Sequence, residues 1–392
     1  MKLLPISYAT RNLGRSPGRM CLSIGGSMLV VLLVLASAGF VTGMQKSIVS
    51  SGNPRNMILM AAGSIESIER SEVAMQTSGI LAASVSGLRE VGGVEAISPE
   101  IHLAIPVSKV EPTNEENTGD LMVFRGVTPA AWLVHEDAQL EFGRLPEPGR
   151  EEIILGRMAA RSLGYEPAET AIGHRLWIGV EPVEVVGILS GSGSVIEGEA
   201  WIDLANLQVI AQRDSLSCVV LTRNEATPAS IDSFAVRRLD LELVAIEETD
   251  YYASLAGFFR PIQWMVIITA ILIAFGGIVG GLNTTYAAFA SRVRELGTLQ
   301  TLGYSRPAIM VSLVQESLLA SAVGALIACG VGLLLIDGIA IRFSLGVFGI
   351  EIDTLVLAAA LTTGLVLGVL GAIIPAWRCL RLPIPEALRT SI

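Results

Sequence analysis

The sequence has few of the side chains that usually carry chemistry, with only 4 cysteines and 3 histidines among 392 residues. Cys218 is the single cysteine between residues 44 and 260, which excludes a disulfide within that stretch. The histidines, His102, His135 and His174, lie 33 and 39 residues apart, and no HExxH or CxxC motif occurs. We therefore predict no metal site and no catalytic residue, and we expect these histidines to be solvated or capping.

A nucleotide-binding motif is also missing. No GxxxxGK[ST] pattern exists, and residues 191–194, Gly-Ser-Gly-Ser, resemble a phosphate loop only in composition. Carboxylates are numerous, but adjacent ones, as in Glu151-Glu152 and Glu247-Glu248, face opposite ways on a strand. We therefore predict a flexible turn, a solvated acidic surface and no cofactor bound by this chain.

Charge is absent from four long runs, one near the N-terminus and three in the last third of the chain. About 20 apolar residues at a rise of 1.5 Å each cross the hydrocarbon core of a bilayer. A lone strand would leave its backbone polar groups unsatisfied in lipid, so these runs predict helices. The predicted transmembrane helices are residues 20–43, 261–290, 307–336 and 354–377.

The first run has a competing interpretation as a secretory signal peptide. It follows basic residues, and Ala36-Ser37-Ala38 has the small side chains of a cleavage site. The run covers residues 20–45, however, which is longer than a usual signal-peptide core. We therefore favour a retained transmembrane helix and keep cleavage as the alternative.

Basic residues predict the orientation in the membrane, because they collect on the cytoplasmic side. They flank the apolar runs as Lys2, Arg11, Arg15 and Arg19, as Arg292, Arg294 and Arg306, and as Arg378, Arg381 and Arg389. We therefore place residues 1–19, 291–306 and 378–392 in the cytoplasm, and residues 44–260 and the short loop 337–353 outside. Residues 44–260 hold 31 acidic and 16 basic side chains, which argues against nucleic acid as a partner.

Residues 44–260 form a predicted mixed α/β domain between the first two membrane helices, long enough for its own core and for two subdomains. Stretch 109–120 is a predicted loop. The remaining predictions are helices at 78–91, 157–163 and from about 228, and strands at 94–97, 103–107, 121–127, 152–155, 175–180, 183–188, 218–222 and 241–246.

The segment after the second membrane helix has an apolar stripe. Val293, Leu296, Leu299 and Leu302 recur every three residues on a predicted short helix, and Gly303 is placed to cap its end. Such a helix can lie on the membrane surface or can offer its face to the groove of a partner protein. Spacing alone leaves both interpretations open.

Several segments together resemble ABC-transporter permeases of the MacB/FtsX/LolC type. RVRELGTLQTLGYSRPAI, followed by ESLLAS, is similar to the family's R-x-x-E-I-G-x-L-x-A-L-G-A pattern and its Glu-Ser. ISYATRNLGRSPGR and PAWRCLRLPIPEALR resemble its cytoplasmic lead-in and tail, and GRLPEPGREEIILGRMAARSLGY resembles its extracytoplasmic domain. Gln300, Thr301, Tyr304 and Cys379 depart from the pattern, and residues 44–120 contain nothing that names a substrate.

The resemblance implies a permease subunit that binds a separate ABC ATPase on the cytoplasmic face, where ATP and Mg would be held, and that pairs with a second permease copy. In this interpretation residues 291–303 form a coupling helix. Its Arg292, Arg294 and Glu295 would pair with the ATPase, beside Val293 and before Gly303, while Leu296 and Leu299 would enter the groove of the ATPase. A periplasmic adaptor is a further implied partner, and the cell (inner) membrane is the implied location.

Glycines and one acid complete the candidate sites. Small residues let helices approach in lipid, and the predicted packing positions are Gly276, Gly277, Gly280, Gly281, Gly364 and Gly368, within the chain or across a dimer. Glu316 is the one acid within reach of the third membrane helix. A helix starting at residue 307 would place it roughly 14 Å along, near the cytoplasmic headgroups.

The function expected from the resemblance is mechanotransmission: ATP hydrolysis by the partner drives export or extraction of a hydrophobic or peptide-like substrate at the outer face. An FtsX-like scaffold that activates a cell-wall hydrolase is the alternative. A membrane-anchored enzyme is the third hypothesis and the weakest, because no nucleophile and base occur together.

Overall fold

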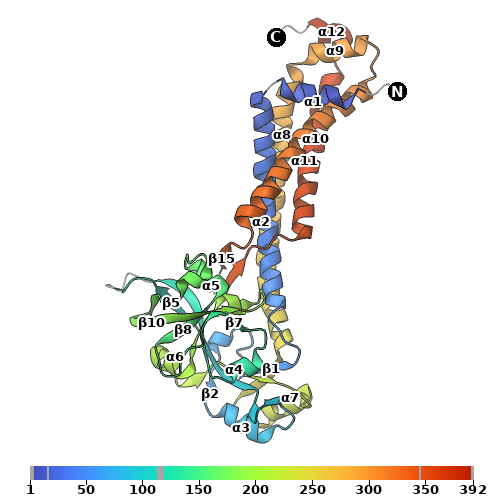
Figure 1. Ribbon diagram of the computed structural model, residues 1–392. Coiled ribbons are helices and arrows are strands. Elements are labelled where there is room, and N and C mark those ends of the chain that lie inside the picture. The colour runs from blue at the N-terminus through green and yellow to red at the C-terminus, as the bar shows by residue number, and fades with distance from the viewer. Residues whose placement is uncertain (1–3, 16, 113–118, 344–345, 390–392) are drawn as a thin grey trace. The chain divides into compact units, whose positions relative to one another are not determined.

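The computed structural model describes residues 4–15, 17–112, 119–343 and 346–389, and the chain divides into two compact units (Figure 1). The helical unit comprises Met1–Thr42, Pro261–Gly338 and Ile350–Ile392. The sheet unit comprises Gly43–Arg260 and Ile339–Gly349. Residues 337–353 were expected to be a loop, but within them β15 (Ala340–Phe343) and β16 (Gly346–Gly349) pair as antiparallel strands and belong to the sheet unit.

Among the described residues, four helices are long and apolar enough to cross a membrane, judged by length and composition. They are α2 (Pro17–Val49), α8 (Glu248–Ala290), α10 (Arg306–Val331) with its continuation η4 (Gly332–Ile336), and α11 (Thr354–Leu380). Each contains one of the charge-free runs. The helices extend beyond the charge-free runs, because the backbone N–H and C=O groups of the polar residues at their ends also form hydrogen bonds within the helix.

Small residues bring the membrane helices together. A Cβ added at Gly364 of α11 would lie 2.6 Å from the Cβ of Ala325 of α10, and one at Gly277 of α8 would lie 2.7 Å from Val30 Cγ2 of α2. These positions therefore require glycine for close packing. A third contact uses the backbone, because Thr285 Oγ1 donates a hydrogen bond of 2.6 Å to the carbonyl of Gly371.

The other glycines predicted to pack differ among themselves. Gly368 is also tight, since its added Cβ would lie 2.9 Å from the Cα of Leu318. Around Gly276, Gly280 and Gly281, in contrast, no described atom lies within 4 Å of an added Cβ. These three positions make no close helix contact within the described part of the chain.

Short helices gather at one end of the helical unit. They are α1 (Ile6–Gly14), α9 (Val293–Thr301) and α12 (Ile384–Arg389), and only α9 was predicted. They share an apolar core with the adjoining ends of α8, α10 and α11. The buried members of this core, which we call the end cluster, are Leu4, Phe289, Val293, Leu296, Ile309, Leu313, Ala372, Ala376, Cys379, Leu380 and Ala387.

The sheet unit is built on one mixed sheet, with strands in the order β14-β1-β13-β5-β6-β11-β8-β10-β7. Strand β9 pairs with both β10 and β5, which closes β5, β6, β11, β8, β10 and β9 into a ring. The strands are β1 (Asn56–Ala61), β5 (Ile97–Ser108), β6 (Asp120–Val127), β7 (Gln139–Gly143), β8 (Glu152–Gly156), β9 (Arg175–Ile178), β10 (Glu181–Ser190), β11 (Ala200–Asp203), β13 (Cys218–Thr222) and β14 (Leu243–Glu247).

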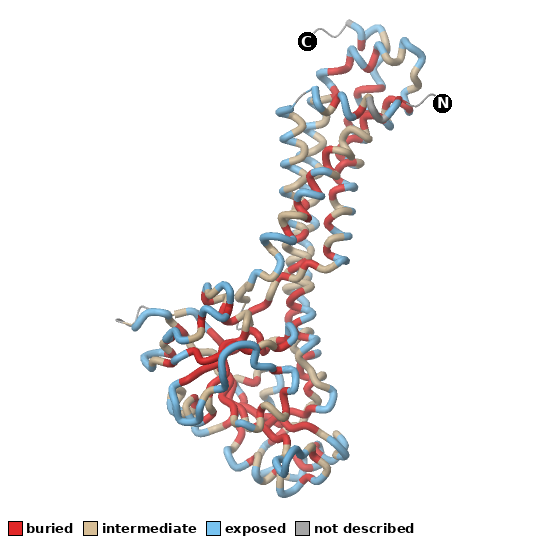
Figure 2. The backbone as a smooth tube through the Cα atoms, viewed as in Figure 1, coloured by how far each residue is buried: buried red, intermediate tan, exposed pale blue. Residues whose placement is uncertain are grey.

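Short helices and two small strand pairs cover this sheet, and the buried residues concentrate in its strands (Figure 2). The helices are α3 (Thr77–Ser84), α4 (Ala131–Val134), α5 (Arg157–Ser162), α6 (Leu204–Ala211) and α7 (Pro228–Arg237), with single turns at η1 (Ile68–Arg70), η2 (Ala168–Ala171) and η3 (Val195–Gly198). The small pairs are β2 (Val73–Ala74) with β12 (Ser215–Leu216), and β3 (Glu90–Val91) with β4 (Val94–Glu95). The sheet is continuous, so the two expected subdomains do not form separate compact units.

Several predicted elements of the sheet unit are confirmed. Strand β8, helix α5 with Gly164 (φ +82) at its end, and the β9–β10 hairpin lie where the sequence predicted them. Helix α7 begins as expected at Pro228, after an N-cap hydrogen bond from Ser230 N to Thr227 Oγ1.

Other predictions are wrong. The helix predicted over 78–91 ends at Ser84, because Val85 is extended and Gly87 has φ +83. Gly92 and Gly93, which follow the predicted helix, form the turn between β3 and β4, where both have positive φ. The strand predicted at 94–97 falls on β4 (Val94–Glu95) and the first residue of β5. The strand predicted at 103–107 lies within β5, which begins earlier than expected, at Ile97. Part of the predicted loop 109–120 lies outside the described residues.

Candidate functional site

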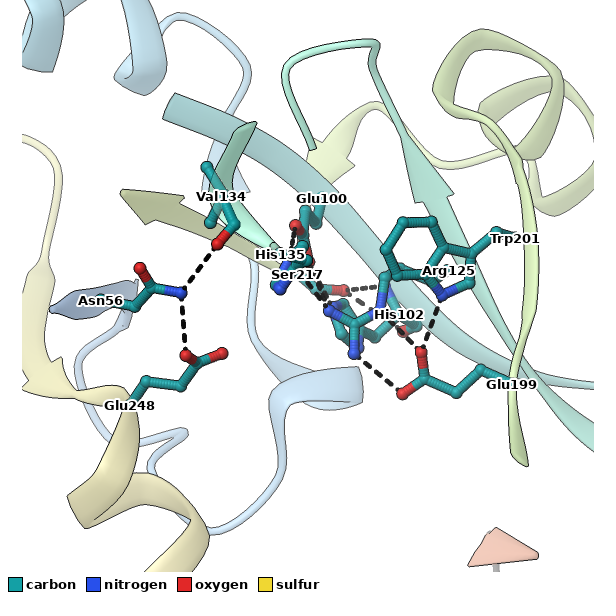
Figure 3. Close-up of polar contacts among 10 residues, drawn as sticks. All are labelled: Asn56, Glu100, His102, Arg125, Val134, His135, Glu199, Trp201, Ser217 and Glu248. Carbon is teal, nitrogen blue, oxygen red and sulfur yellow. Dashed lines mark hydrogen bonds and ion pairs between the residues drawn. The ribbon is translucent and has the colours of Figure 1, made fainter. Parts of the chain in front are cut away.

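A buried polar network lies on the sheet unit, where the sequence predicted no site. Its centre is Glu100 of β5, which is fully buried, and around it lie His102, Arg125 of β6 and His135, exposed by only 5%, 2% and 6% (Figure 3). Glu199, just before β11, completes the inner group at 7% exposure. Buried charges on this scale are retained only when they are paired and hydrogen-bonded.

Strand geometry assembles the network. Glu100 and His102 are two residues apart on β5, so their side chains share one face, while Ile101 between them joins the apolar core on the other. His102 stands directly opposite Arg125 on β6, and Arg125 is in register with Trp201 of β11. Residues more than 70 positions apart therefore meet in one row across three strands.

The hydrogen bonds are short and complete. Arg125 donates to both oxygens of Glu199, from Nε at 2.7 Å and from Nη2 at 2.8 Å, and to Glu100 Oε2 from Nη1 at 2.9 Å. Glu100 also contacts the Nε2 atoms of His102 at 3.0 Å and His135 at 2.7 Å. Each carboxylate oxygen of Glu100 thus has a partner, which holds the two imidazoles and the guanidinium in fixed positions.

The pKa values follow from burial and these partners. Burial alone would raise the pKa of Glu100, but the charges of His135 and Arg125 and the imidazole hydrogen bonds outweigh it and hold this pKa well below its usual value. Burial likewise opposes the ionised form of Glu199, whose pKa is nevertheless lowered by Arg125. The pKa of Arg125 is raised, because Glu199 and Glu100 overcome the effect of its own burial. Both carboxylates and the guanidinium are therefore charged at neutral pH.

A second buried acid, Glu248, lies at the start of α8, and Figure 3 shows it with Asn56 on the opposite side from Glu199. Its Oε2 atom accepts hydrogen bonds from Asn56 Nδ2 at 2.9 Å and from the backbone N–H of Asn53 at 3.0 Å. Burial is the main influence on its carboxyl group and raises the pKa of Glu248.

A metal site is the first chemistry to test here. Glu100, His102 and Cys218 are buried, and their ligand atoms lie within 4.8 Å of one another, a donor set that Zn²⁺ accepts. The guanidinium of Arg125, however, lies 2.9 Å from Glu100 and brings a fixed positive charge to this place. Burial raises the pKa of the Cys218 thiol well above its usual value, so the metal-binding thiolate is disfavoured. We therefore assign no metal to this cluster.

The network corrects two predictions. All three histidines were expected to be solvated or capping, but His102 and His135 are buried, and only His174 is exposed. Of the acids predicted to be solvated, Glu151 is exposed, but Glu152 and Glu248 are buried. The signal was present in the sequence, because Glu100 and His102 alternate with apolar residues inside a strand, although nothing in the spacing identified Arg125 as their partner.

The predicted coupling helix, α9, is present, but its apolar face points inward. Val293 and Leu296 are 6% and 1% exposed and belong to the end cluster, and Leu299 is half-buried against it. Leu296 was expected to enter the groove of a partner. In this structure it packs against its own chain, because α12 and the adjoining helix ends cover that face.

The exposed face of α9 is polar, with one apolar side chain at its end. Arg294, Glu295 and Thr298 are exposed, and Leu302 is 70% exposed. Gly303 follows with φ +92, and its N–H bonds to the carbonyl of Gln300, so it ends the helix as predicted. A partner that binds this helix would meet these residues.

Arg292 is buried beside this face and pairs within the chain. Its Nη1 atom lies 3.1 Å from both carboxylate oxygens of Glu316 on α10, and its Nε atom lies 3.4 Å from Glu295. Asn12 of α1 donates a hydrogen bond of 2.9 Å to Glu316 Oε2. The carboxylate of Glu316 on α10 therefore links α10 to α1 and to the segment that precedes α9. We call Asn12, Arg292 and Glu316 the latch.

The family follows from comparison with known proteins. The MacB-like periplasmic core domain matches residues 20–234, more than half of the chain, and the FtsX-like permease C-terminal domain matches residues 267–384. The chain belongs to the MacB/FtsX family of ABC transporter permeases. The second match covers most of α8 and all of α9, α10 and α11, and the first covers the network except Glu248.

Relatives of this permease are distant. It is 23% identical over 391 residues to the macrolide export ATP-binding/permease protein MacB of an Azoarcus species, and 26% identical over 247 residues to that of Hyphomonas neptunium. It spans 56% and 36% of the length of these two proteins. The uncharacterized ABC transporter permease YknZ of Bacillus subtilis is 23% identical over 386 residues, with 93% of this chain and 91% of YknZ covered.

Two solved structures of extracytoplasmic regions are also similar to this permease. One is the periplasmic region of MacB from Actinobacillus actinomycetemcomitans, with a TM-score of 0.38 and 10% identity over 53% of this chain and 94% of that one. The other is the extracellular domain of YknZ, with a TM-score of 0.36 and 14% identity over 49% of this chain and 99% of that one.

Proposed function

We propose that this permease couples ATP hydrolysis by a separate ABC ATPase to movement of a hydrophobic or peptide-like substrate at the outer face of the membrane. Most of the sheet unit, Gly43–Arg260, lies between the first and second membrane helices in the sequence. In this proposal the sheet unit is on the extracytoplasmic side, and both termini lie in the cytoplasm. The membrane is the cell (inner) membrane. A second copy or a related permease completes the transporter, and a periplasmic adaptor is a further partner in this proposal.

The observation that carries this proposal is the joint presence of both family domains on one chain, with a rigid cytoplasmic end cluster. The latch and the end cluster fix α9 to the ends of three membrane helices. A force applied to α9 by the ATPase would therefore reach α10 and α11 directly. This supports a mechanical role in which the chain supplies no catalytic group.

The contact with the ATPase is proposed at the exposed face of α9. Because Leu296 is buried in the chain itself, we assign the contact to Arg294, Glu295, Thr298 and the protruding Leu302. Leu302 is the apolar anchor in this proposal, with the charged residues around it supplying orientation.

Co-purification tests the assignment. The chain and its ATPase are expressed together, extracted in detergent and isolated through a tag on the permease, and the ATPase retained per permease is measured. Leu302→Glu should lower the amount of ATPase retained per permease at least about tenfold. Loss of an interface anchor typically costs about 2 kcal/mol or more of binding free energy. Val209→Glu, at a side chain 78% exposed on the sheet unit, is the matched control and should not change it.

ATP hydrolysis gives the second measurement. The isolated chain should hydrolyse ATP no faster than background, and activity should appear with the partner. Strong hydrolysis by the chain alone, or full retention of the ATPase by Leu302→Glu, would count against the proposed function. If the sheet unit instead captured a cell-wall hydrolase and no transport occurred, the scaffold alternative would replace it.

A further inference from the structure

The sheet unit contains a cavity of about 430 Å³, which lies beside the buried polar network. One wall is formed by the sheet, with Ile58, Val123 and Val220. The opposite side is formed by the first turns of α8 and by strand β16. All of these segments belong to the sheet unit, and the volume falls in the range of small-molecule pockets.

Aromatic rings line the α8 and β16 side of the cavity. Tyr251, Tyr252 and Phe259 are each 7% exposed, and Phe348 is 3% exposed. The ring centroids of Phe259 and Phe348 lie 6.1 Å apart in an edge-to-face arrangement, and those of Tyr251 and Tyr252 lie 5.3 Å apart. Such fixed rings offer an apolar surface and negative ring faces, which attract cations.

The polar side of the cavity is acidic. Arg125, Glu199, His102 and Glu248 line it, and Glu66, Glu69 and Arg70 of the η1 region line it as well. The guanidinium of Arg125 is occupied by the two carboxylates of Glu199 and Glu100, so it has no charge to spare for an anion. Among the side chains that line the cavity, the four carboxyl groups of Glu66, Glu69, Glu199 and Glu248 outnumber the two guanidiniums of Arg70 and Arg125.

Glu248 can accept further hydrogen bonds. Its Oε2 atom accepts two hydrogen bonds, but its Oε1 atom accepts none from any described residue. An acceptor in a buried, acidic and aromatic-lined cavity is matched by a positively charged donor. A carboxylate or phosphate ligand would meet repulsion from Glu248 and Glu199 instead.

We propose that this cavity binds a lipophilic amine, with its apolar body against Tyr251, Tyr252, Phe259 and Phe348 and its ammonium group on Glu248. Naming this amine as a transport substrate rests on the proposed function, whereas its binding does not. The ligand enters from outside the membrane if the sheet unit is extracytoplasmic.

Three probes with one carbon skeleton test the proposal: 4-phenylbutylamine, 4-phenylbutan-1-ol and 4-phenylbutanoate. The full chain is reconstituted in lipid nanodiscs without the ATPase, and binding is measured by equilibrium dialysis with empty nanodiscs subtracted. The amine should saturate at one per chain and should bind about tenfold more tightly than the alcohol, the worth of one charge-assisted hydrogen bond. The carboxylate should bind more weakly than the alcohol.

Two variants locate the site. Glu248→Gln should remove the preference for the amine over the alcohol while alcohol binding remains. Val123→Trp should fill the cavity and abolish binding of all three probes. The control, Val209→Trp, adds the same ring at an exposed position and should bind like the native chain.

Three outcomes would overturn the proposal. Absence of saturable amine binding, equal or tighter binding of the carboxylate, or unchanged amine binding in Val123→Trp would do so. Loss of ATPase coupling with intact amine binding would instead contradict only the proposed function. Intact coupling with no amine binding would contradict only the cavity assignment.

Discussion

At the scale of single residues, the stability of the sheet unit depends on charged side chains that are buried in its strands. Glu100 accepts hydrogen bonds from three cationic or imidazole groups and is fully buried. Burying ions is costly, so a network of this kind stabilises the fold only while it is complete. Its members are therefore expected to be more sensitive to conservative substitution than neighbouring apolar residues.

The first prediction concerns Glu100→Gln. The change keeps the shape but leaves Arg125 short of one negative partner in a buried place, which should cost roughly 3–5 kcal/mol of unfolding free energy. Denaturant unfolding of the full chain in detergent, followed by tryptophan fluorescence, measures it. Glu181→Gln, at an exposed position, should change the free energy by less than about 0.5 kcal/mol. Equal effects of the two variants would contradict the importance of the network.

A pH dependence follows from Glu152. Hydrogen bonds from Arg144, at 2.7 and 2.6 Å, lower the pKa of Glu152 to about 2 despite its burial. Because the folded pKa lies below the unfolded value of about 4.3, this group stabilises the fold fully above that value, and its contribution is lost as the pH falls towards 2. Glu152→Gln should therefore be less stable than the native chain at pH 6 and should lose less stability between pH 5 and pH 3. Parallel curves for the two proteins would exclude this role.

At the scale of elements, the sequence predicted what depends on local pattern. The four charge-free runs identify α2, α8, α10 and α11, since length and apolarity alone define a membrane helix. The β9–β10 hairpin and α5 were also predictable, because their alternation and their terminal glycine are local signals.

Elements that depend on distant partners were not predictable. The inward face of α9 is decided by α12, almost 90 residues later, so an apolar stripe could not distinguish a partner's groove from the chain's own core. The network and cavity likewise join β5, β6, β11 and α8, and the ring of strands requires β9 to pair with β5. The spacing of residues along the sequence does not indicate which distant elements pack together.

The latch gives the prediction at this scale. Arg292→Glu or Glu316→Arg alone should break the ion pair and place like charges together, whereas the double swap should restore a pair. Asn12 can then offer its amide oxygen to the new arginine. Thermal unfolding in detergent should give a coupling energy of about 1–3 kcal/mol between the two sites, as for other contacting charges.

A matched pair provides the control for the latch. Arg238 and Asp240, 2.7 Å apart on the surface of the sheet unit, should give a coupling of only about 0–1 kcal/mol in the same double-mutant cycle. A latch coupling no larger than this would mean that Asn12, Arg292 and Glu316 do not hold the end cluster together.

At the scale of the whole molecule, the two units divide the work that the proposed function requires. The helical unit has apolar, glycine-dependent contacts and a polar latch at one end, as expected for an element that transmits force. The sheet unit has the cavity and the acidic surface. Around Gly276 and Gly280 of α8, no atom of the described residues lies within 4 Å of an added Cβ, so these two glycines are not used in packing among the described helices.

The last prediction is the orientation of the chain, which rests on the basic residues beside the membrane helices. Arg381 stacks 3.7 Å from the ring centroid of Trp377, and such pairs are typical of a membrane interface. The native Cys218 and Cys379 are buried and would report poorly, so we place single cysteines at exposed positions in a cysteine-free chain. Val209→Cys should react with a membrane-impermeant maleimide in intact spheroplasts, and Leu302→Cys should react only after permeabilisation. The opposite pattern would invert the topology and would separate α9 from any cytoplasmic ATPase, so this one measurement bears on the function as well as on the fold.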